Sequence, residues 1–462
     1  MSRLFKRLSS TITVKAAPSK AHLHQPLPPS SFPTGYLLTG IHAGVKKKPG
    51  VLDLALIVST SDHPASAAAC FTRNAFKAAP VVVSDQILTQ NGGRARAVVV
   101  NSGCANAVTG RQGLEDAWAM VRETDALLPP SASTAENHTL VMSTGVIGQN
   151  LPIEKIVHGI RSQATSARTL ASDFPAWERA AQAFMTTDTF PKLRSRVFTI
   201  NGTEFRMAGM DKGAGMIHPD MGPATTAFPA LHATLLGCIL TDAAVSPRSL
   251  QSALTYAVER SFNSISVDGD MSTNDTILVL ANGAAAANGG QVVEIDQETD
   301  KEGYEIFKTE LTAFAVELAQ LVVRDGEGAT KFVTVNVKGA PTFEDAHRIA
   351  SRVSTSALVK TALYGEDANW GRILAATGSV SVPALDPSKV SVTFLPSDNT
   401  AALRVLVNGE PEVVDEVRAK EILGLEDFGI CIDLGGIGNE EATYWTCDFS
   451  YEYVRINGDY RS

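Results

Sequence analysis

Short apolar runs typical of strands alternate with helical patterns along the chain, and this alternation limits the fold more than any other feature of the sequence. Between residues 307 and 323 the apolar positions follow helical spacing, and we expect that helix to stop at Gly326. Directly afterwards Val333, Val335 and Val337 alternate with polar residues, which predicts a half-buried strand. A long helix followed at once by a strand is typical of a mixed α/β protein.

The same signals recur elsewhere in the chain. Thr342 with Asp345 three residues later indicates the start of another helix. The runs 81–83 and 97–100 predict strands, and the second of them is followed by 101–103, which is rich in turn-forming residues. The sequence therefore predicts the class α/β, while the pattern alone does not fix the order of the strands.

Length and charge narrow the class of protein and of partner. A chain of 462 residues is long enough for two or three domains, or for one large two-part α/β domain with a sizeable core. The uncharged apolar stretch 276–293 is interrupted by asparagines and glycines, so we expect no transmembrane segment. A net charge of −9 argues against nucleic acid and against a membrane surface as partners, which leaves a small molecule.

Cysteine and histidine spacing gives no sign of a metal site. The five cysteines are scattered without any Cys-x-x-Cys pair, so we expect free, buried thiols in a reducing compartment. The nine histidines include no His-x-x-x-His pair with a third ligand nearby. We therefore expect no metal and no bound cofactor.

The N-terminal segment differs in composition from the rest of the chain. No acidic residue occurs before Asp53, whereas five basic residues lie within a Ser-, Ala- and Leu-rich beginning. This composition is typical of a mitochondrial transit peptide, which we assign to 1–20, and it predicts the mitochondrial matrix as the location. The alternative is a disordered basic tail with no targeting role. The proline-rich segment 26–33 resembles a linker, so we expect folding to begin near Thr34.

The residues that suggest chemistry are densest between 185 and 275. Residues 185–189 place three threonines beside Asp188, a pattern that on its own is typical of a capping or turn segment. Lys212 opens a glycine-rich segment that ends at Pro219. That segment lacks the Walker spacing, which makes a phosphate cradle a weak interpretation, and a solvent-exposed turn is the simpler alternative.

The strongest motif contains Thr234, between Ala233 and the apolar run Leu235-Leu236, with Thr241-Asp242-Ala243 shortly after it. Taken alone, such a threonine is usually only a strand side chain. Together with the glycine-rich segment it resembles the ornithine acetyltransferase family, ArgJ, also called glutamate N-acetyltransferase. Further blocks that resemble the family, in the family's order, are Thr72-Arg73-Asn74, Asn101-Ser102-Gly103, Ser143-Thr144-Gly145, Ser261-Phe262-Asn263, Asp268-Gly269-Asp270, Ser272-Thr273-Asn274-Asp275, Glu327-Gly328-Ala329-Thr330-Lys331, Gly365-Glu366-Asp367, Asn369-Trp370-Gly371-Arg372 and Ile456-Asn457.

The resemblance implies a fold, a processing event and a nucleophile. The fold implied is the N-terminal-nucleophile type of the ArgJ and DmpA proteins, self-cleaved into an α chain, 21–233, and a β chain, 234–462, that stay in one structure. The Thr234 hydroxyl would attack the Ala233 carbonyl, and the α-amine freed by the cut would then serve the same hydroxyl as its base. An α-amine has a pKa of about 7.7–8.0, so a useful neutral fraction exists near physiological pH.

The resemblance also implies a reaction and a set of site residues. The reaction is the transfer of an acetyl group from N-acetylornithine, and also from acetyl-CoA as a co-substrate, to glutamate in arginine biosynthesis. Thr144 and Gly145 would stabilise the oxyanion through a hydroxyl and a backbone N–H, although a tight strand connection is the simpler reading of that turn. The implied substrate-binding residues are Thr186 or Thr187, Lys212, Thr234, Glu327, Asn457 and Ser462. The two chains of the precursor would form a heterodimer, and we expect a higher oligomer.

The sequence departs from the family's pattern in two places. Residues 222–232 are inserted before the Ala-Thr pair, and they contain a second candidate pair, Ala224-Thr225. Thr234 is favoured because the family's Leu-Leu-Gly and Thr-Asp-Ala blocks follow it and not Thr225. The other departure is Ser462, which stands where threonine is common and keeps the hydroxyl.

Two other classes of function compete with the acyltransferase. An N-terminal-nucleophile aminopeptidase or amidase would use the same self-cleavage with water as the acceptor, and fold alone does not exclude it. The amino-acid-selecting set of Lys212, Glu327 and Asn457 argues against it. A binding protein that has lost catalysis would lack the nucleophile or the oxyanion donors, and this sequence has both.

Overall fold

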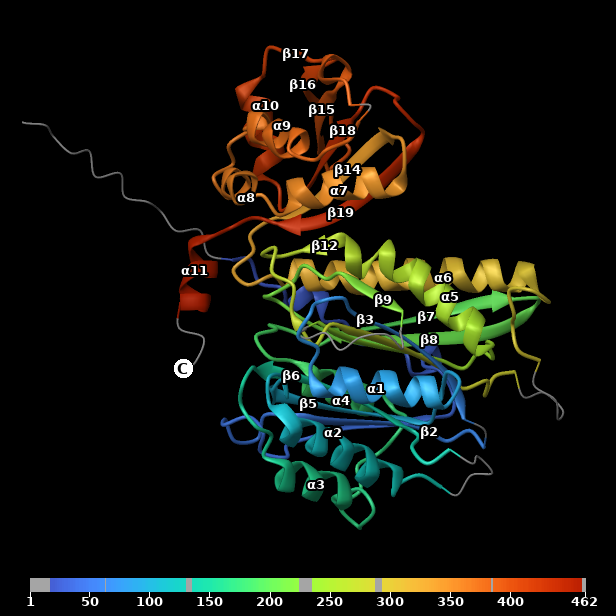
Figure 1. Ribbon diagram of the computed structural model, residues 1–462. Helices are drawn as coiled ribbons and strands as arrows, with labels where there is room; N and C mark the ends of the chain where they lie inside the picture. Colours follow the sequence, from blue (N-terminus) through green and yellow to red (C-terminus); the bar gives the residue numbers. More distant parts are fainter. Residues whose placement is uncertain are drawn as a thin grey trace, which may run out of the picture.

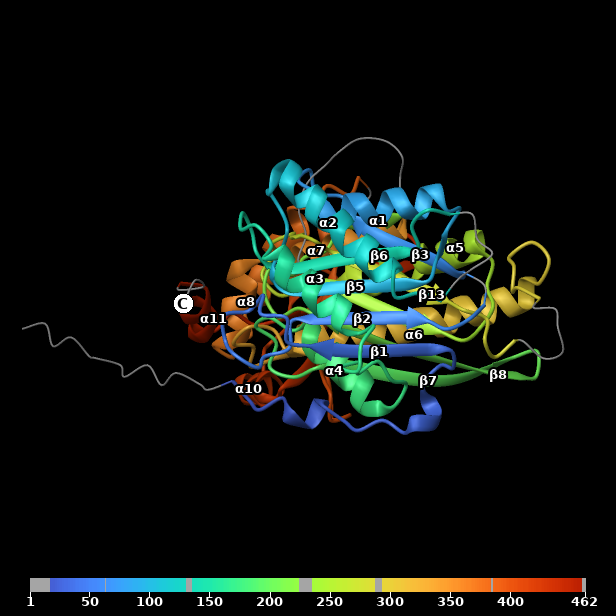
Figure 2. The same cartoon turned by 90° about the horizontal axis from the view of Figure 1, so that it is seen from below.

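The computed structural model describes residues 17–62, 64–129, 135–223, 235–286, 293–383 and 385–458 (Figures 1 and 2). Within these ranges the strands form three sheets, and helices cover or separate them. The predicted class, mixed α/β, is confirmed. Residues 1–16 of the segment assigned as a transit peptide lie outside the described residues.

The first sheet is built from the N-terminal third of the chain. Its strand order is β1 (Tyr36–Ile41), β2 (Leu54–Ser59), β5 (Ala97–Cys104) and β6 (Thr139–Val146), which Figure 2 shows side by side. The last two strands are parallel and the other neighbours are antiparallel. Helices α2 (Gly110–Asp125) and α3 (Ile153–Ser162) cover its outer face (Figure 1).

The second sheet lies in the middle of the molecule. Its order is β4 (Arg94–Ala95), β3 (Ala65–Thr72), β13 (Thr276–Ala281), β11 (Leu236–Thr241), β8 (Thr203–Lys212) and β7 (Lys192–Ile200), and β9 (Met221–Pro223) also pairs with β3. Helices α1 (Ala79–Gln90) and α4 (Phe174–Phe184) lie between the first and second sheets. Helices α5 (Pro247–Glu259) and α6 (Lys301–Arg324) cover the other face.

The third sheet is built mainly from the C-terminal third of the chain. Its order is β12 (Ile265–Ser266), β19 (Glu440–Cys447), β14 (Phe332–Ala340), β18 (Asp427–Asp433), β15 (Ser391–Pro396), β16 (Leu403–Val407) and β17 (Glu410–Pro411). Its helices are α7 (Phe343–Ser354), α8 (Ala357–Tyr364), α9 (Trp370–Gly378) and α10 (Glu416–Gly424). The last helix, α11 (Tyr451–Gly458), stands apart from this group and buries none of its residues (Figure 1).

The long periodic segments form the elements that the sequence predicts. The helix expected over 307–323 is α6, which ends at Arg324, two residues before Gly326. The alternating valines lie in β14 and are buried. The side chain of Thr342 accepts a hydrogen bond from the backbone N–H of Asp345 at 3.1 Å, and this cap begins α7.

One short prediction is wrong, and a second places the end of its strand too early. The run 81–83 lies in α1 and not in a strand, because Pro80 occupies the first turn of a helix and the valines bury part of the helix surface. The strand predicted at 97–100 is confirmed as β5, but it continues through 101–103 to Cys104. Pairing with β6 along this stretch overrides the turn-forming tendency of the three residues.

The chain also packs against the rest of the molecule earlier than the composition suggests. Phe32 is buried and stacks on Trp177, with 4.8 Å between the ring centroids. Lys20 is buried too, and its ammonium lies 2.5 Å from the carboxylate of Glu426. The proline-rich segment is therefore part of the folded body, and folding does not begin at Thr34.

Candidate active site

The end of β6 holds the predicted oxyanion residues in a narrow turn. Thr144 is fully buried, and Gly145 has a φ of +127°. A Cβ atom on Gly145 would lie 2.3 Å from the carbonyl carbon of Gly103 on the neighbouring strand, so only glycine fits. The close approach of the two strands, together with a register shift at Cys104, sets this turn.

Lys212 is the last residue of β8 and reaches the same turn from the second sheet. Its side chain is buried, and its ammonium donates a hydrogen bond to Oγ1 of Thr144 at 3.3 Å. Burial lowers the pKa of Lys212, and Lys192 adds to this effect, while Asp188, Asp275 and Glu327 oppose it. A candidate substrate-binding cation and a candidate oxyanion donor are therefore in direct contact.

Asp188 ties the threonine segment to the glycine-rich segment. Its carboxylate accepts hydrogen bonds from the backbone N–H of Thr186 at 2.8 Å and of Gly213 at 2.8 Å. Burial would raise the pKa of Asp188, but Lys192, 2.5 Å away, and Lys212 hold it well below its usual range. The charged carboxylate thus joins the backbone of Thr186 to that of Gly213, the residue after Lys212. Thr186 and Thr187 are both half-buried, and which of them contacts substrate stays an open prediction.

Glu327 and Asn457 meet on the other side of the glycine-rich segment. The amide of Asn457, on the exposed helix α11, donates to the buried Glu327 carboxylate at 2.7 Å. The backbone N–H of Glu327 donates to the carbonyl of Ala214 at 2.8 Å. A Cβ atom on Gly215 would lie 2.3 Å from Oε2 of Glu327, so this glycine lets the carboxylate lie directly on the backbone. The structure therefore brings Thr144, Gly145, Lys212, Glu327 and Asn457 around one segment.

Asp268 holds the rest of the glycine-rich segment, a role that sequence reasoning did not assign. Its carboxylate accepts hydrogen bonds from the backbone N–H of Met216 at 2.5 Å and of Ile217 at 2.9 Å. The hydroxyl of Tyr453, on α11, also donates to it at 3.3 Å. The motif Asp268-Gly269-Asp270 was visible in the sequence, but nothing there shows which backbone its carboxylate binds.

Asn274 and Asp275 fix the two strands that meet at the site, and sequence reasoning gave them no role. The amide of Asn274 donates to the carbonyls of Ser143 at 2.5 Å and Ala105 at 2.6 Å, so it joins β6 to the segment that follows β5. The carboxylate of Asp275 accepts from the backbone N–H of Leu235 at 2.5 Å. Leu235 directly follows the predicted nucleophile in the chain.

Three of the predicted site residues lie outside the described residues. They are Ala233, Thr234 and Ser462, and the competing candidate Thr225 lies outside them as well. Their roles stay predictions. The described residues that flank the predicted cut are Pro223 at the end of β9 and Leu235 before β11.

Comparison with known proteins decides the family. The ArgJ family matches residues 37–462 of this chain. The mitochondrial arginine biosynthesis bifunctional protein ArgJ of Laccaria bicolor is 75% identical over 100% of both chains, and that of Coprinopsis cinerea is 74% identical over 99% of both. The chain belongs to the ArgJ family.

Among solved structures, the ArgJ protein of Bacillus halodurans is 35% identical to this chain. The match covers 47% of this chain and 96% of that one, with a TM-score of 0.42. Membership of the ArgJ family confirms the predicted enzyme class, an acyltransferase of arginine biosynthesis. The names of the close relatives confirm the mitochondrial location.

None of the helices in the described ranges combines the length and the apolar character needed to cross a bilayer. In those same ranges, His, Cys, Asp and Glu do not gather in threes in a way that could hold a metal ion.

Proposed function

We propose that this chain transfers an acetyl group from N-acetylornithine to glutamate through an acetyl ester on Thr234. The observation that carries the proposal is that the buried Lys212 and the buried Glu327 both adjoin the glycine-rich segment, with Lys212 in contact with Thr144. A free amino acid carries a carboxylate and an ammonium, and a buried lysine and a buried glutamate complement these two charges. The side-chain amide of Asn457 donates a hydrogen bond to the carboxylate of Glu327 and orients it.

The nucleophile is made by a cut between Ala233 and Thr234. The Thr234 hydroxyl attacks the Ala233 carbonyl carbon, the C–N bond breaks, and the acyl group moves to oxygen while the nitrogen takes up the proton. Water then hydrolyses this ester, which leaves a carboxylate on Ala233 and a free α-amine on Thr234. The chain 21–233 and the chain 234–462 remain together, and we expect this heterodimer to assemble further.

The transfer itself uses the same hydroxyl twice. The α-amine accepts the hydroxyl proton as the oxygen attacks the acetyl carbonyl, and the ornithine amine leaves with that proton. The amine of glutamate then attacks the acetyl ester, and the Thr234 hydroxyl is restored. Both steps pass through an oxyanion, for which the Thr144 hydroxyl and the Gly145 N–H are donors. The Lys212 ammonium polarises the Thr144 hydroxyl and so strengthens it as a donor.

Acetyl-CoA serves as a second donor in this proposal. Its thioester carbonyl is attacked by the Thr234 hydroxyl, the C–S bond breaks, and the thiol leaves with the proton. The resulting acetyl ester is the same as that formed from N-acetylornithine, so acceptor recognition by Lys212 and Glu327 does not change with the donor.

Initial-rate kinetics with N-acetylornithine and glutamate test the proposed function. We expect parallel double-reciprocal lines, because an acetyl-enzyme separates the two half-reactions. Mass spectrometry after mixing with N-acetylornithine alone should find one acetyl group on the chain that begins at Thr234. Rapid hydrolysis of N-acetylornithine with no dependence on glutamate would contradict the proposal and favour an amidase.

A further inference from the structure

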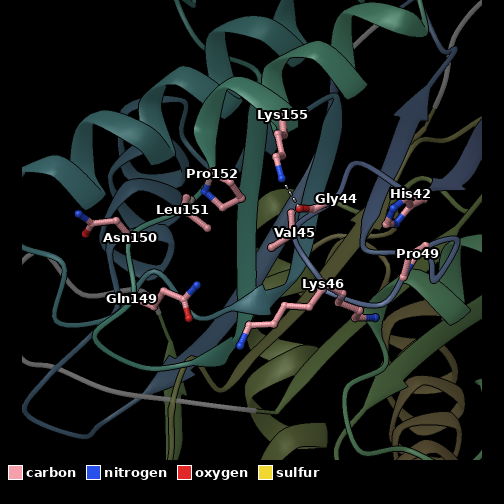
Figure 3. Close-up of a pocket in the computed structure, with 11 residues that line it drawn as sticks. His42, Gly44, Val45, Lys46, Pro49, Gln149, Asn150, Leu151, Pro152 and Lys155 are labelled. Carbon is pink, nitrogen blue, oxygen red and sulfur yellow. Dashed lines mark hydrogen bonds between the residues drawn. The ribbon is translucent and has the colours of Figure 1, made fainter. Parts of the chain in front are cut away.

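A basic pocket lies beside the oxyanion turn, formed by the loops that follow β1 and β6 (Figure 3). Its cavity has a volume of about 430 Å³. Residues 42–49 form one wall and residues 149–155 form the other. None of the described residues assigned above to substrate recognition lines this pocket.

Asp53 shapes the first wall. Its buried carboxylate accepts four backbone hydrogen bonds, from the N–H groups of Ala43 at 2.6 Å, Gly44 at 3.0 Å, Val45 at 2.7 Å and Lys46 at 3.0 Å. The four N–H groups hold the loop in one fixed curve. This carboxylate is therefore occupied by backbone and does not line the pocket.

The charges that do line the pocket are all basic. They are Lys46, Lys47 and Lys155, with His42 beside them, and no aspartate or glutamate belongs to the described lining. Lys155 lies on α3 and points toward Gly44, whose carbonyl its ammonium reaches at 3.4 Å (Figure 3). Three lysines in one cavity are more positive charge than the single α-carboxylate of an amino acid requires, and they suit the several charges of phosphate groups.

The burial of Lys46 links this pocket to the acetyl-transfer site. Burial lowers the pKa of Lys46 to about 8, with Lys212 adding to the effect and Asp53 and Asp188 opposing it. An anion bound in the pocket would stabilise the charged form of this lysine. The carboxylate of Asp188 and the ammonium of Lys212 belong to the site described above, so the pocket lies within electrostatic range of that site.

The backbone also places the pocket close to the oxyanion turn. Gln149 follows Gly145 by four residues, which limits their separation to about 14 Å. The side chain of Lys46 covers Gly103, since a Cβ atom there would lie 3.2 Å from its Cγ. Gly103 pairs with Gly145 in the β5–β6 register. A ligand seated in the pocket can therefore extend a chain of atoms to the turn.

We propose that this pocket binds the phosphate groups of a nucleotide-linked acyl thioester, so that the acetyl end reaches Thr144 and Gly145. This inference rests on the proposed acetyl transfer, and it assigns the donor's phosphates to Lys46, Lys47 and Lys155. The donor that fits is acetyl-CoA. N-acetylornithine has no phosphate, and its use does not depend on these lysines.

Lysine variants assayed with three donors test the pocket. In Lys47→Ala and Lys155→Ala we expect the KM for acetyl-CoA to rise about tenfold each, because each loses a charged contact with phosphate. The KM for N-acetylornithine and for acetyl-pantetheine, a thioester without the nucleotide, should stay within twofold. Lys48→Ala is the matched control, since Lys48 is exposed in the same loop and does not line the pocket, and it should change none of the three.

A direct binding measurement tests the phosphate pocket independently of acetyl transfer. Titration of the wild-type protein with adenosine 3′,5′-bisphosphate should show binding that both lysine variants weaken, whether or not acetyl transfer is observed. Equal losses for acetyl-pantetheine and acetyl-CoA would overturn the phosphate assignment. Transfer from N-acetylornithine with no binding of the bisphosphate would overturn the pocket and leave the proposed function intact.

Discussion

In the proposed function, buried charged side chains provide most of the substrate specificity. Lys212 is enclosed at the end of β8, where its ammonium contacts Thr144 and lies in the field of Glu327 and Asp188. Burying a charge is costly unless it is paired, so a buried lysine beside a candidate oxyanion donor indicates a role in binding or catalysis more than in packing.

Lys212→Ala should raise the KM for glutamate. One lost hydrogen bond to a charged group is worth about 1.5–3 kcal/mol, which corresponds to roughly a tenfold to hundredfold rise. Self-cleavage should suffer less, because the charge is assigned to substrate recognition. Steady-state kinetics and a denaturing gel of the same preparation measure both effects. An unchanged KM would make Lys212 a structural residue.

Asp211 predicts a pH dependence of stability that has nothing to do with catalysis. Its side chain is fully buried, and in the described residues neither carboxyl oxygen has a hydrogen-bond partner. Burial raises the pKa of Asp211 well above the ordinary value of 3.8. The native carboxyl therefore keeps its proton at a pH at which the unfolded chain releases it, so stability falls as the pH rises from about 4 toward neutral.

Asp211→Asn should remove this dependence and leave the protein at least as stable at pH 7. The amide is neutral and of similar size. The unfolded variant therefore has no carboxyl group at this position whose ionisation favours unfolding at higher pH. Urea unfolding of both proteins at pH 5 and pH 7 measures the difference. A strong loss of stability at pH 7 would instead show that an ionised Asp211 pairs with Lys192.

The site residues proposed from the sequence are those that belong to recognisable motifs. Thr144, Gly145, Lys212, Glu327 and Asn457 come from four separate segments, and the structure brings them together. The supporting residues were not assigned, because Asp188, Asp268 and Asn274 bind backbone atoms of distant segments. In a sequence such residues look like ordinary turn formers.

At the scale of elements, the glycine at the end of β6 can be tested against a neighbour in the same backbone region. Gly145→Ala should abolish transfer and destabilise the fold, because its Cβ would lie 2.3 Å from the backbone of Gly103. Gly148→Ala is the matched control, since Gly148 also has a positive φ, +75°, but open space around it.

Gly148→Ala should lower the free energy of unfolding by only about 1 kcal/mol, because alanine is strained in the left-handed region, and should keep activity. Thermal melting and kcat, measured for both variants, separate the two cases. Equal behaviour of the two variants would contradict the close-approach account of the oxyanion turn.

Helix α11 predicts the opposite pattern, a loss of function without a loss of stability. It buries none of its residues, and Asn457 reaches Glu327 from it. Asn457→Ala should leave the melting temperature nearly unchanged and raise the KM for N-acetylornithine and glutamate about tenfold, because the carboxylate of Glu327 loses a hydrogen bond. A large drop in melting temperature with an unchanged KM would place the role of Asn457 in folding.

Long helices and strands could be predicted from the sequence more reliably than short ones. Helix α6 has 24 residues and repeats its apolar positions over several turns, and the alternation in β14 is equally clear. The three valines at 81–83 are too few to separate a strand from a helix. Pro80, in the first turn of α1, was the signal that could have decided for the helix.

At the scale of the whole molecule, the second sheet mixes strands from both sides of the proposed cut. β8 precedes Thr234 and pairs with β11, which follows it, and β13 pairs with β11 on one side and β3 on the other. No pattern in the sequence predicts these pairings, because they join segments far apart in the chain. Cleavage between 233 and 234 would leave the hydrogen bonds of this sheet in place, so we expect the two chains to co-purify under native conditions.

N-terminal sequencing and intact mass of the purified chains test the central claim, that Thr234 is both the new N-terminus and the nucleophile. The wild type and Thr225→Ala should each give a chain that begins Thr-Leu-Leu-Gly, and both should be active. Thr234→Ala should give one uncut, inactive precursor, because the cut and the acetyl ester need the same oxygen. Two chains from Thr234→Ala, or one chain from Thr225→Ala, would contradict the account.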